Sequence, residues 1–207
     1  MVEMTNLPIQ IKPGLWRWEC AHPDWVAGAA PDSPGDFPEL VGSVACATNE
    51  GMLLIDPLIT DDYHHLWKWL ADQSARLGGV TSVLTTIQWH NRSGGDAMER
   101  FACDDHIPTG VQPIPIEGAG ETMFWLEAHG ALVPGDRLIG NGTGGLRVCP
   151  PSWVEESVPG GLAPGVIEKR LAPLLDLPVE MVLVSHGEPV LVDAAQAIAQ
   201  AIDGASN

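Results

Sequence analysis

Polar side chains that can do chemistry follow a short apolar run in the first half of the chain. Residues 80–86 are apolar and rich in β-branched side chains, which predicts a buried strand. The sequence then reads WHNRSGG over 89–95, and a helical spacing resumes over 96–103. In α/β proteins, ligand-binding groups usually lie where a strand ends and a helix begins. His90 is the strongest metal ligand or acid–base group in this turn.

The elements before this turn predict a βαβ unit. Runs 41–47 and 51–55 predict a hairpin whose second strand ends in Asp56. Apolar residues at helical spacing predict an amphipathic helix over 61–77. The strand over 80–86 follows this helix. Strand, helix and strand of these lengths form a βαβ unit.

The second half of the chain repeats the order of a hairpin followed by helices. Residues 122–126 and 131–133 predict a second hairpin, which ends in Gly135-Asp136. Two hairpin-bearing halves predict two sheets packed face to face with helices outside. The other expected elements are an interrupted strand over 9–19, a long loop over 20–40, a strand over 111–116, a glycine-rich loop over 140–151, a helix over 166–175, a strand over 179–184 and a helix over 190–202.

Length and composition limit the class of protein. The 207 residues suit one domain spanning 1–207. Acids outnumber bases 27 to 10, and the formal net charge of −17 argues against nucleic acid or an anionic membrane surface as partner. No apolar run approaches the roughly 18 residues of a membrane helix. Four scattered cysteines and the lack of a secretory leader predict a cytoplasmic protein with reduced thiols. We expect a small-molecule substrate or ligand, and a homo-oligomer stays possible.

Four segments, in this order, resemble those of the metallo-β-lactamase-fold hydrolases. The segments are LLIDP at 53–57, VTSVLTT and SGG within 80–95, FWLEAHGALVPGDRLIG at 124–140 and VLVSHGEPV at 182–190. The family has a strand ending in Asp, a strand before a His-x-His-x-Asp-His ligand run and Gly-Gly, a hairpin ending in Gly-Asp, and a late strand ending in Gly-His-Gly or similar. The resemblance covers about residues 40–190. It implies an α+β fold, a four-layer αββα sandwich with two mixed sheets face to face and helices outside.

The family's metal-binding run is replaced in this sequence. Anchored on Gly94-Gly95, its four ligand positions fall on Ile87, Trp89, Asn91 and Arg92. The family's third His falls near Glu117. An apolar side chain, an indole and a guanidinium do not bind metal ions, so the ordinary two-zinc site is not expected.

Three residues nevertheless allow a rebuilt site for one metal ion. Asp136 and His186 match family ligands residue by residue, and Asp56 matches a residue behind the ligands. With His90 they form a two-His, one-carboxylate set, which suits one Zn or Fe ion with open positions. Strand alternation would point His90 to the wrong face, so the strand must end early or bulge. The expected function is hydrolysis of a small ester, lactone or thioester with His90, Asp136 and His186 as metal-binding and catalytic residues. The residues expected to contact the substrate are Trp89, Arg92, Glu117 and Trp153.

The same residues also allow a metal-free protein. A single His beside a Trp is typically a hydrogen-bonded structural residue. Arg92 could supply the missing positive charge by pairing with Asp56 or Asp136. The chain would then be a catalytically inactive relative that serves as a small-ligand-binding or protein-interaction module.

Overall fold

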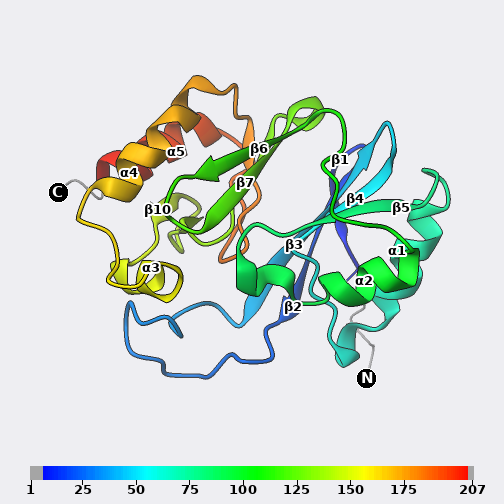
Figure 1. The fold of residues 1–207 in the computed structure, drawn as a ribbon, viewed down its shortest axis with the longest axis horizontal. Coiled ribbons are helices and arrows are strands. Elements are labelled where there is room, and N and C mark those ends of the chain that lie inside the picture. Colours follow the sequence, from blue (N-terminus) through cyan, green and yellow to red (C-terminus); the bar gives the residue numbers. More distant parts are fainter. Residues whose placement is uncertain (1–6, 205–207) are drawn as a thin grey trace.

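A computed structural model describes residues 7–204, in which two mixed β-sheets lie between helices (Figure 1). The first sheet has five strands in sequential order, antiparallel except for its last pair, which is parallel. These strands are β1 (Ile9–Lys12), β2 (Leu15–Ala21), β3 (Leu40–Thr48), β4 (Gly51–Ile55) and β5 (Val80–Leu84). The interruption at Pro13-Gly14 is therefore a turn between two paired strands.

The second sheet has four strands in the order β11-β8-β7-β6. Its first pair is parallel and the other two are antiparallel. The strands are β6 (Val111–Ile116), β7 (Glu121–Leu126), β8 (Ala131–Val133) and β11 (Met181–Val182). Both hairpins expected from the sequence are therefore present, one in each sheet.

The helices cover the outer faces of the two sheets (Figure 1). Five α-helices occur within residues 7–204: α1 (His65–Ser74), α2 (Gly94–Phe101), α3 (Pro151–Ser157), α4 (Val166–Leu171) and α5 (Ala194–Gly204). Helices α1 and α2 lie on the first sheet, and α4 and α5 lie on the second. The expected four-layer αββα sandwich is confirmed. None of the described helices is long and apolar enough to cross a membrane.

Alternation along the strands divides the core into layers. In β4, Leu53 and Ile55 pack between the two sheets, whereas Met52 and Leu54 pack under α1 and α2. Strand β7 alternates in the same way, with Phe124 between the sheets. Since neighbouring side chains of a strand point to opposite faces, a strand buried on both faces must be apolar throughout. This explains the continuous apolar runs in the sequence.

Two segments differ from the predictions because of pairing between distant residues. The expected loop over 140–151 contains strand β10 (Leu146–Val148), which pairs with β9 (Leu138–Gly140). The strand expected over 179–184 shortens to β11, and α5 begins at Ala194 instead of 190. Val182 and Val190 exchange two backbone hydrogen bonds, which hold the chain extended before α5.

Short helical turns also replace parts of the predicted helices. The helix expected over 61–77 is a 3₁₀ turn, η1 (Asp61–Tyr63), followed by α1. Helix α3 was not predicted, because Pro150-Pro151 suggested a break; Pro151 instead occupies the first turn, where its missing N–H costs nothing. Two more 3₁₀ turns are η3 (Glu127–His129) and η4 (Ala172–Asp176), the latter completing the helix expected over 166–175.

The long loop over 22–39 extends from the first sheet to α3 (Figure 1). Within the loop, the Trp25 indole donates to the Phe37 carbonyl at 3.0 Å. At its far end, the Trp153 indole of α3 donates to the Ser33 carbonyl at 2.7 Å. The loop is thereby fixed over the edge of the sandwich where His90, Asp136 and His186 meet.

Candidate metal centre

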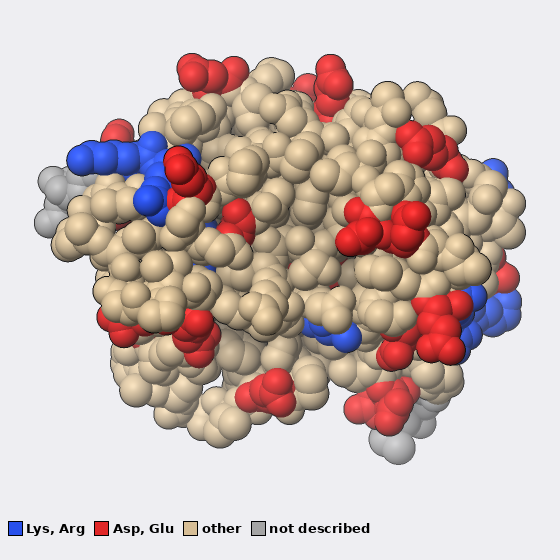
Figure 2. All heavy atoms as spheres, in the orientation of Figure 1, with Lys and Arg blue, Asp and Glu red and all other residues tan. Residues whose placement is uncertain are grey.

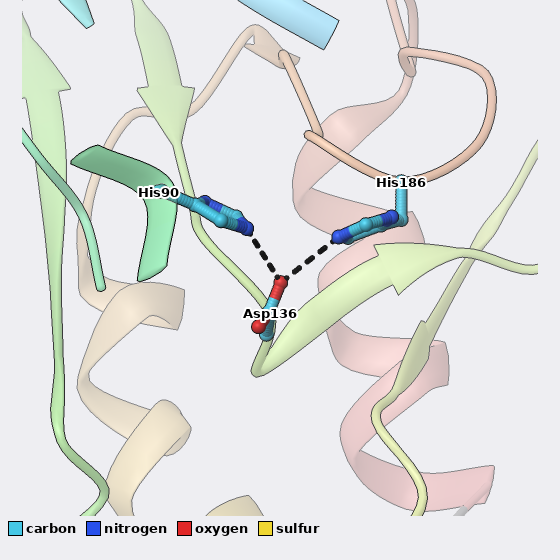
Figure 3. A group of neighbouring side chains, drawn as sticks. All are labelled: His90, Asp136 and His186. Carbon is cyan, nitrogen blue, oxygen red and sulfur yellow. Dashed lines mark ion pairs between the residues drawn. The ribbon is translucent and has the colours of Figure 1, made fainter. Parts of the chain in front are cut away.

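His90, Asp136 and His186 converge in one buried cluster (Figure 3). The Nε2 atoms of both imidazoles lie 3.1 Å from the same oxygen, Oδ1 of Asp136. The three candidate ligand atoms lie within 4.8 Å of one another. The structure therefore brings together the three residues that the sequence suggested as metal ligands.

An early end of strand β5 directs His90 into the cluster. The strand stops at Leu84, and a 3₁₀ turn, η2 (Gln88–Asn91), carries His90. A bridge between Ile87 and Glu121 ties the start of this turn to the second sheet. The change of direction replaces strand alternation at this point, so the histidine can face the core. This is the early turn that the sequence required.

Asp56 holds the His90 ring from behind. Oδ2 of Asp56 lies 2.9 Å from His90 Nδ1, and the Thr86 backbone N–H donates to Oδ1 at 2.8 Å. Both side chains are almost fully buried. A carboxylate only accepts hydrogen bonds, so His90 donates through Nδ1. A neutral His90 then has its acceptor nitrogen, Nε2, directed at the cluster, as in carboxylate–histidine–metal arrangements.

The loop between β8 and β9 presents Asp136. Its second oxygen, Oδ2, accepts a hydrogen bond from the Trp89 indole at 2.7 Å. The buried carboxylate of Glu121 accepts the backbone N–H groups of Gly135, Asp136 and Arg137 at 3.1, 2.6 and 2.8 Å. A Cβ at Gly135 would lie 2.6 Å from Thr86 Oγ1, so this position requires glycine. The loop therefore has little freedom.

The sequence interpretation missed Glu121 as a site residue. The available signal is one acid at the start of the otherwise largely apolar strand ETMFWL. Burial and the Asp136 charge raise the pKa of Glu121 to about 7, against the opposing effects of Arg137 and the backbone N–H donors. Glu121 thus combines a structural role with an unusual titration.

This titration predicts a pH-dependent stability difference. Because the folded pKa of about 7 exceeds the ordinary 4.5, folded Glu121 keeps a proton that the unfolded chain loses between these values. Both proteins are first freed of metal by chelation. The free energy of unfolding of wild type minus that of Glu121→Gln should then fall by up to about 3 kcal/mol as the pH rises through this range. Urea unfolding of both proteins at the same pH measures this difference, in which the protonation of all other groups cancels. A difference that stays constant or grows would contradict the assignment.

His186 lies in the turn after β11 and is held mainly by aromatic rings. Phe37 and Trp153 contact its ring edge-on, each with a centroid distance of 5.3 Å. Its Nδ1 is buried and has no hydrogen-bond partner among the described residues. Its carbonyl accepts the Gly140 N–H at 2.9 Å. A Cβ at Gly140 would lie 3.1 Å from the Glu188 nitrogen, so the turn can approach β9 only because this residue is glycine.

The cluster separates the protonation states of its members. Burial alone would raise the pKa of Asp136, but the positive charge of His90 and the nearby imidazole of His186 hold it well below its usual value. Burial and Arg92 lower the pKa of His90, yet Asp136 and Asp56 together raise it to about 9. Burial lowers the pKa of His186. Without metal, His90 is therefore a cation beside the Asp136 anion, and a metal ion must displace its proton.

A cavity of about 600 Å³ opens onto the cluster. Trp89, Arg92 and Trp153, three of the four residues expected to contact substrate, line it together with the cluster. Glu117 does not join them: it is exposed and borders a separate hollow. The acid that the β6–β7 turn places next to the cluster is Glu121, four residues after Glu117.

The metal-free interpretation expected Arg92 to pair with the carboxylate of Asp56 or Asp136. The structure shows no such ion pair. Its Nη1 donates to the carbonyls of Gly42 and Asp56 at 3.2 and 3.4 Å, and its Nη2 donates to Ser185 Oγ at 2.8 Å. Residue 92 follows η2 with φ +40°, which directs its side chain toward β3. All three acceptors are uncharged.

No protein-family model matches the sequence. No curated protein sequence is significantly similar to it. Solved structures are similar over nearly the whole chain. The metallo-β-lactamase from Pontibacter korlensis has a TM-score of 0.60 at 13% identity, with 95% of this chain and 98% of that chain covered. The one from Erythrobacter litoralis has a TM-score of 0.60 at 13% identity, covering 96% and 91%.

A third similar structure contains a defined metal state. It is the metallo-β-lactamase FIM-1 from Pseudomonas aeruginosa in the mono-zinc form, with a TM-score of 0.62 at 10% identity, covering 96% of this chain and 95% of that chain. At such identities the similarity establishes the fold only, and the function has to be inferred from the residues of the site. The chain has the metallo-β-lactamase fold, as the four sequence segments suggested.

Proposed function

We propose that the chain binds one Zn or Fe ion through His90, Asp136 and His186 and hydrolyses a small ester, lactone or thioester. The observation that carries this proposal is the environment of Asp136 Oδ1. This oxygen is buried and makes no hydrogen bond of acceptable geometry, although two imidazole nitrogens lie 3.1 Å away. A buried carboxylate oxygen without a hydrogen bond is costly unless a cation satisfies it.

Two of the three donor separations and the chemistry of the donors fit such an ion. Metal–nitrogen and metal–oxygen bonds of about 2.0–2.1 Å in a tetrahedron separate neighbouring ligands by about 3.3 Å. The observed separation between Asp136 Oδ1 and each Nε2 is 3.1 Å. Two imidazoles and one carboxylate leave open positions, which a catalytic ion requires. The mono-zinc form of FIM-1 further supports a single ion in this fold.

The chain's own residues prepare the site for chemistry. A bound ion would polarise a substrate carbonyl and lower the pKa of water. Asp56 fixes the His90 ring, and Trp89 holds Asp136 Oδ2 so that Oδ1 faces both histidines. Phe37 and Trp153 orient His186 and form apolar walls that limit water. The cavity of about 600 Å³ suits a small organic substrate.

Metal analysis of protein purified without a His tag tests the proposal. We expect about one Zn or Fe ion per wild-type chain and less than about a tenth as much in His186→Ala, because the remaining two ligands bind weakly. The matched control is His106→Ala, which removes an exposed histidine outside the cluster and should retain the metal. Hydrolysis of a panel of esters, lactones and thioesters should follow metal content across these proteins.

A metal-free result would overturn the proposal. Wild-type protein that stays below about a tenth of an equivalent after incubation with excess Zn²⁺ would have no site of useful affinity. The metal-free alternative, a ligand-binding or interaction module, would then be the working hypothesis. Hydrolysis that persists at full rate in His186→Ala would likewise remove the cluster from the reaction.

A further inference from the structure

Arg92 carries a positive charge that no described carboxylate neutralises by direct contact. The chain has 27 acids and only ten lysines and arginines, and Figure 2 shows acidic side chains across the viewed face with few basic ones. Acids are therefore plentiful partners for a cation. Among the described lysines and arginines, ion pairs with acids are formed by Lys12, Arg17, Lys68 and Arg147. Arg92 forms none, although it lines the cavity beside the cluster.

Hydrogen bonds fix the guanidinium of Arg92 in place but do not involve all of its N–H donors. Three of its five N–H groups donate to Gly42 O, Asp56 O and Ser185 Oγ. Its Nε is buried without a partner, and one N–H on Nη2 also has no acceptor. Because Nε has almost no accessible surface, an acceptor from outside the chain would have to bind at the outer nitrogens of this cavity-lining side chain.

Arg137, an arginine with a purely structural role in the same fold, provides a comparison. It is completely buried and does not line the cavity. Its Nε donates to Ala119 O, its Nη1 to Trp153 O and its Nη2 to Ser157 Oγ. Every nitrogen of its guanidinium thus has an acceptor within the protein. Arg92 differs from it in lining the cavity and in having no acceptor at Nε.

The charge balance of the site also favours an anion. With a divalent ion bound, the charges of the metal and Arg92 exceed by one those of Asp56 and Asp136. Two further acids, Asp24 and Glu156, lie at the mouth of the cavity, but both are exposed, where water screens their charge. This excess of one positive charge is present while the buried Glu121 beside Asp136 is protonated, and it is cancelled when Glu121 is ionised.

We propose that Arg92 binds a carboxylate group of the ligand, so that the cavity takes a small, largely apolar acyl compound carrying a carboxylate besides its reactive group. Guanidinium groups bind planar carboxylates through charge-assisted hydrogen bonds. Leu58, Ile59, Phe37 and Trp153 supply apolar walls for the rest of the molecule. This substrate class rests on the proposed function, whereas carboxylate binding itself requires only Arg92.

Benzoate and its neutral analogue benzamide test the proposal on metal-free, chelated protein. Titrations are followed by tryptophan fluorescence, because Trp89 and Trp153 line the cavity. We expect wild type to bind benzoate at least about tenfold more tightly than benzamide. Arg92→Gln should remove this preference and Arg92→Lys should keep part of it. The control Arg100→Gln removes an exposed charge on α2 and should keep all of it.

Two results would overturn carboxylate binding by Arg92: equal affinities of wild type for benzoate and benzamide, or an unchanged preference in Arg92→Gln. Because Arg92 also joins β3 to the turn at Ser185, circular dichroism must show that each variant is folded. If the Gln variant unfolds, Arg92→Met and Arg92→Lys provide the comparison. Since no metal is present, a protein that fails the metal analysis can still show the benzoate preference, which separates the two proposals.

Discussion

Chelation of the metal-loaded protein is expected to lower its melting temperature by about 10 °C. A ligand that binds only the folded state stabilises it by about 4 kcal/mol at a thousandfold excess over its Kd. For a chain of this size each kcal/mol shifts the melting temperature by roughly 2–4 °C. The three ligands come from η2, the β8–β9 loop and the turn after β11, so the ion joins both sheets. Differential scanning calorimetry with and without EDTA measures the shift.

The ligand variants provide the control for this measurement. His90→Ala lacks a ligand, so its melting temperature should not respond to EDTA. Added Zn²⁺ should raise the melting temperature of chelated wild type back to its starting value and leave that of His90→Ala unchanged. An identical melting temperature for wild type before and after chelation would support the metal-free alternative. In that state the His90 cation, held between Asp56 and Asp136, would take the place of the ion.

Replacement of Asp56 by alanine is expected to destabilise the protein by about 3–5 kcal/mol, the usual cost of breaking a buried ion pair. Asp56 is buried and contacts His90 Nδ1, the Thr86 hydroxyl and the Thr86 backbone N–H. Loss of a carboxylate behind a metal-bound histidine also typically lowers metal affinity 10–100-fold. Urea unfolding measures the first effect, and competition with a chromophoric chelator measures the second.

Asp56→Asn separates these two effects. The amide keeps the shape of the side chain and one acceptor oxygen, so most of the stability should return. It lacks the negative charge that orients and polarises His90, so metal affinity should remain lowered. Wild-type metal affinity in a folded Asp56→Asn protein would show that Asp56 supports the structure only.

Much of the fold was predictable because its signals are local and repeated. Strand runs such as 51–55 are apolar throughout, since their side chains pack on both faces of a sheet. The order of hairpins and helices then favours two facing sheets. The short strands β9 and β10 could not be predicted, because each consists of three residues that become a strand only by pairing with the other.

The site shows the same division. Glu117 and Glu121 are both acids near one turn, and only the register of β6 with β7 decides that Glu121 is buried. The partners of Arg92 are backbone carbonyls of Gly42 and Asp56 and the Ser185 hydroxyl. These groups lie up to 93 positions away along the chain and leave no residue pattern that indicates them.

The sequence by itself determined the chemistry available to this protein: two imidazoles and a carboxylate at His90, Asp136 and His186, and a cation at Arg92. Side-chain type and position at strand ends are local properties, so the order of residues along the chain is enough to identify them. Only the tertiary structure decided that the three donors meet around one oxygen of Asp136 and that Arg92 keeps unused donors beside them. Those outcomes depend on packing two sheets and a 3₁₀ turn together, and therefore on distances between residues far apart in the chain.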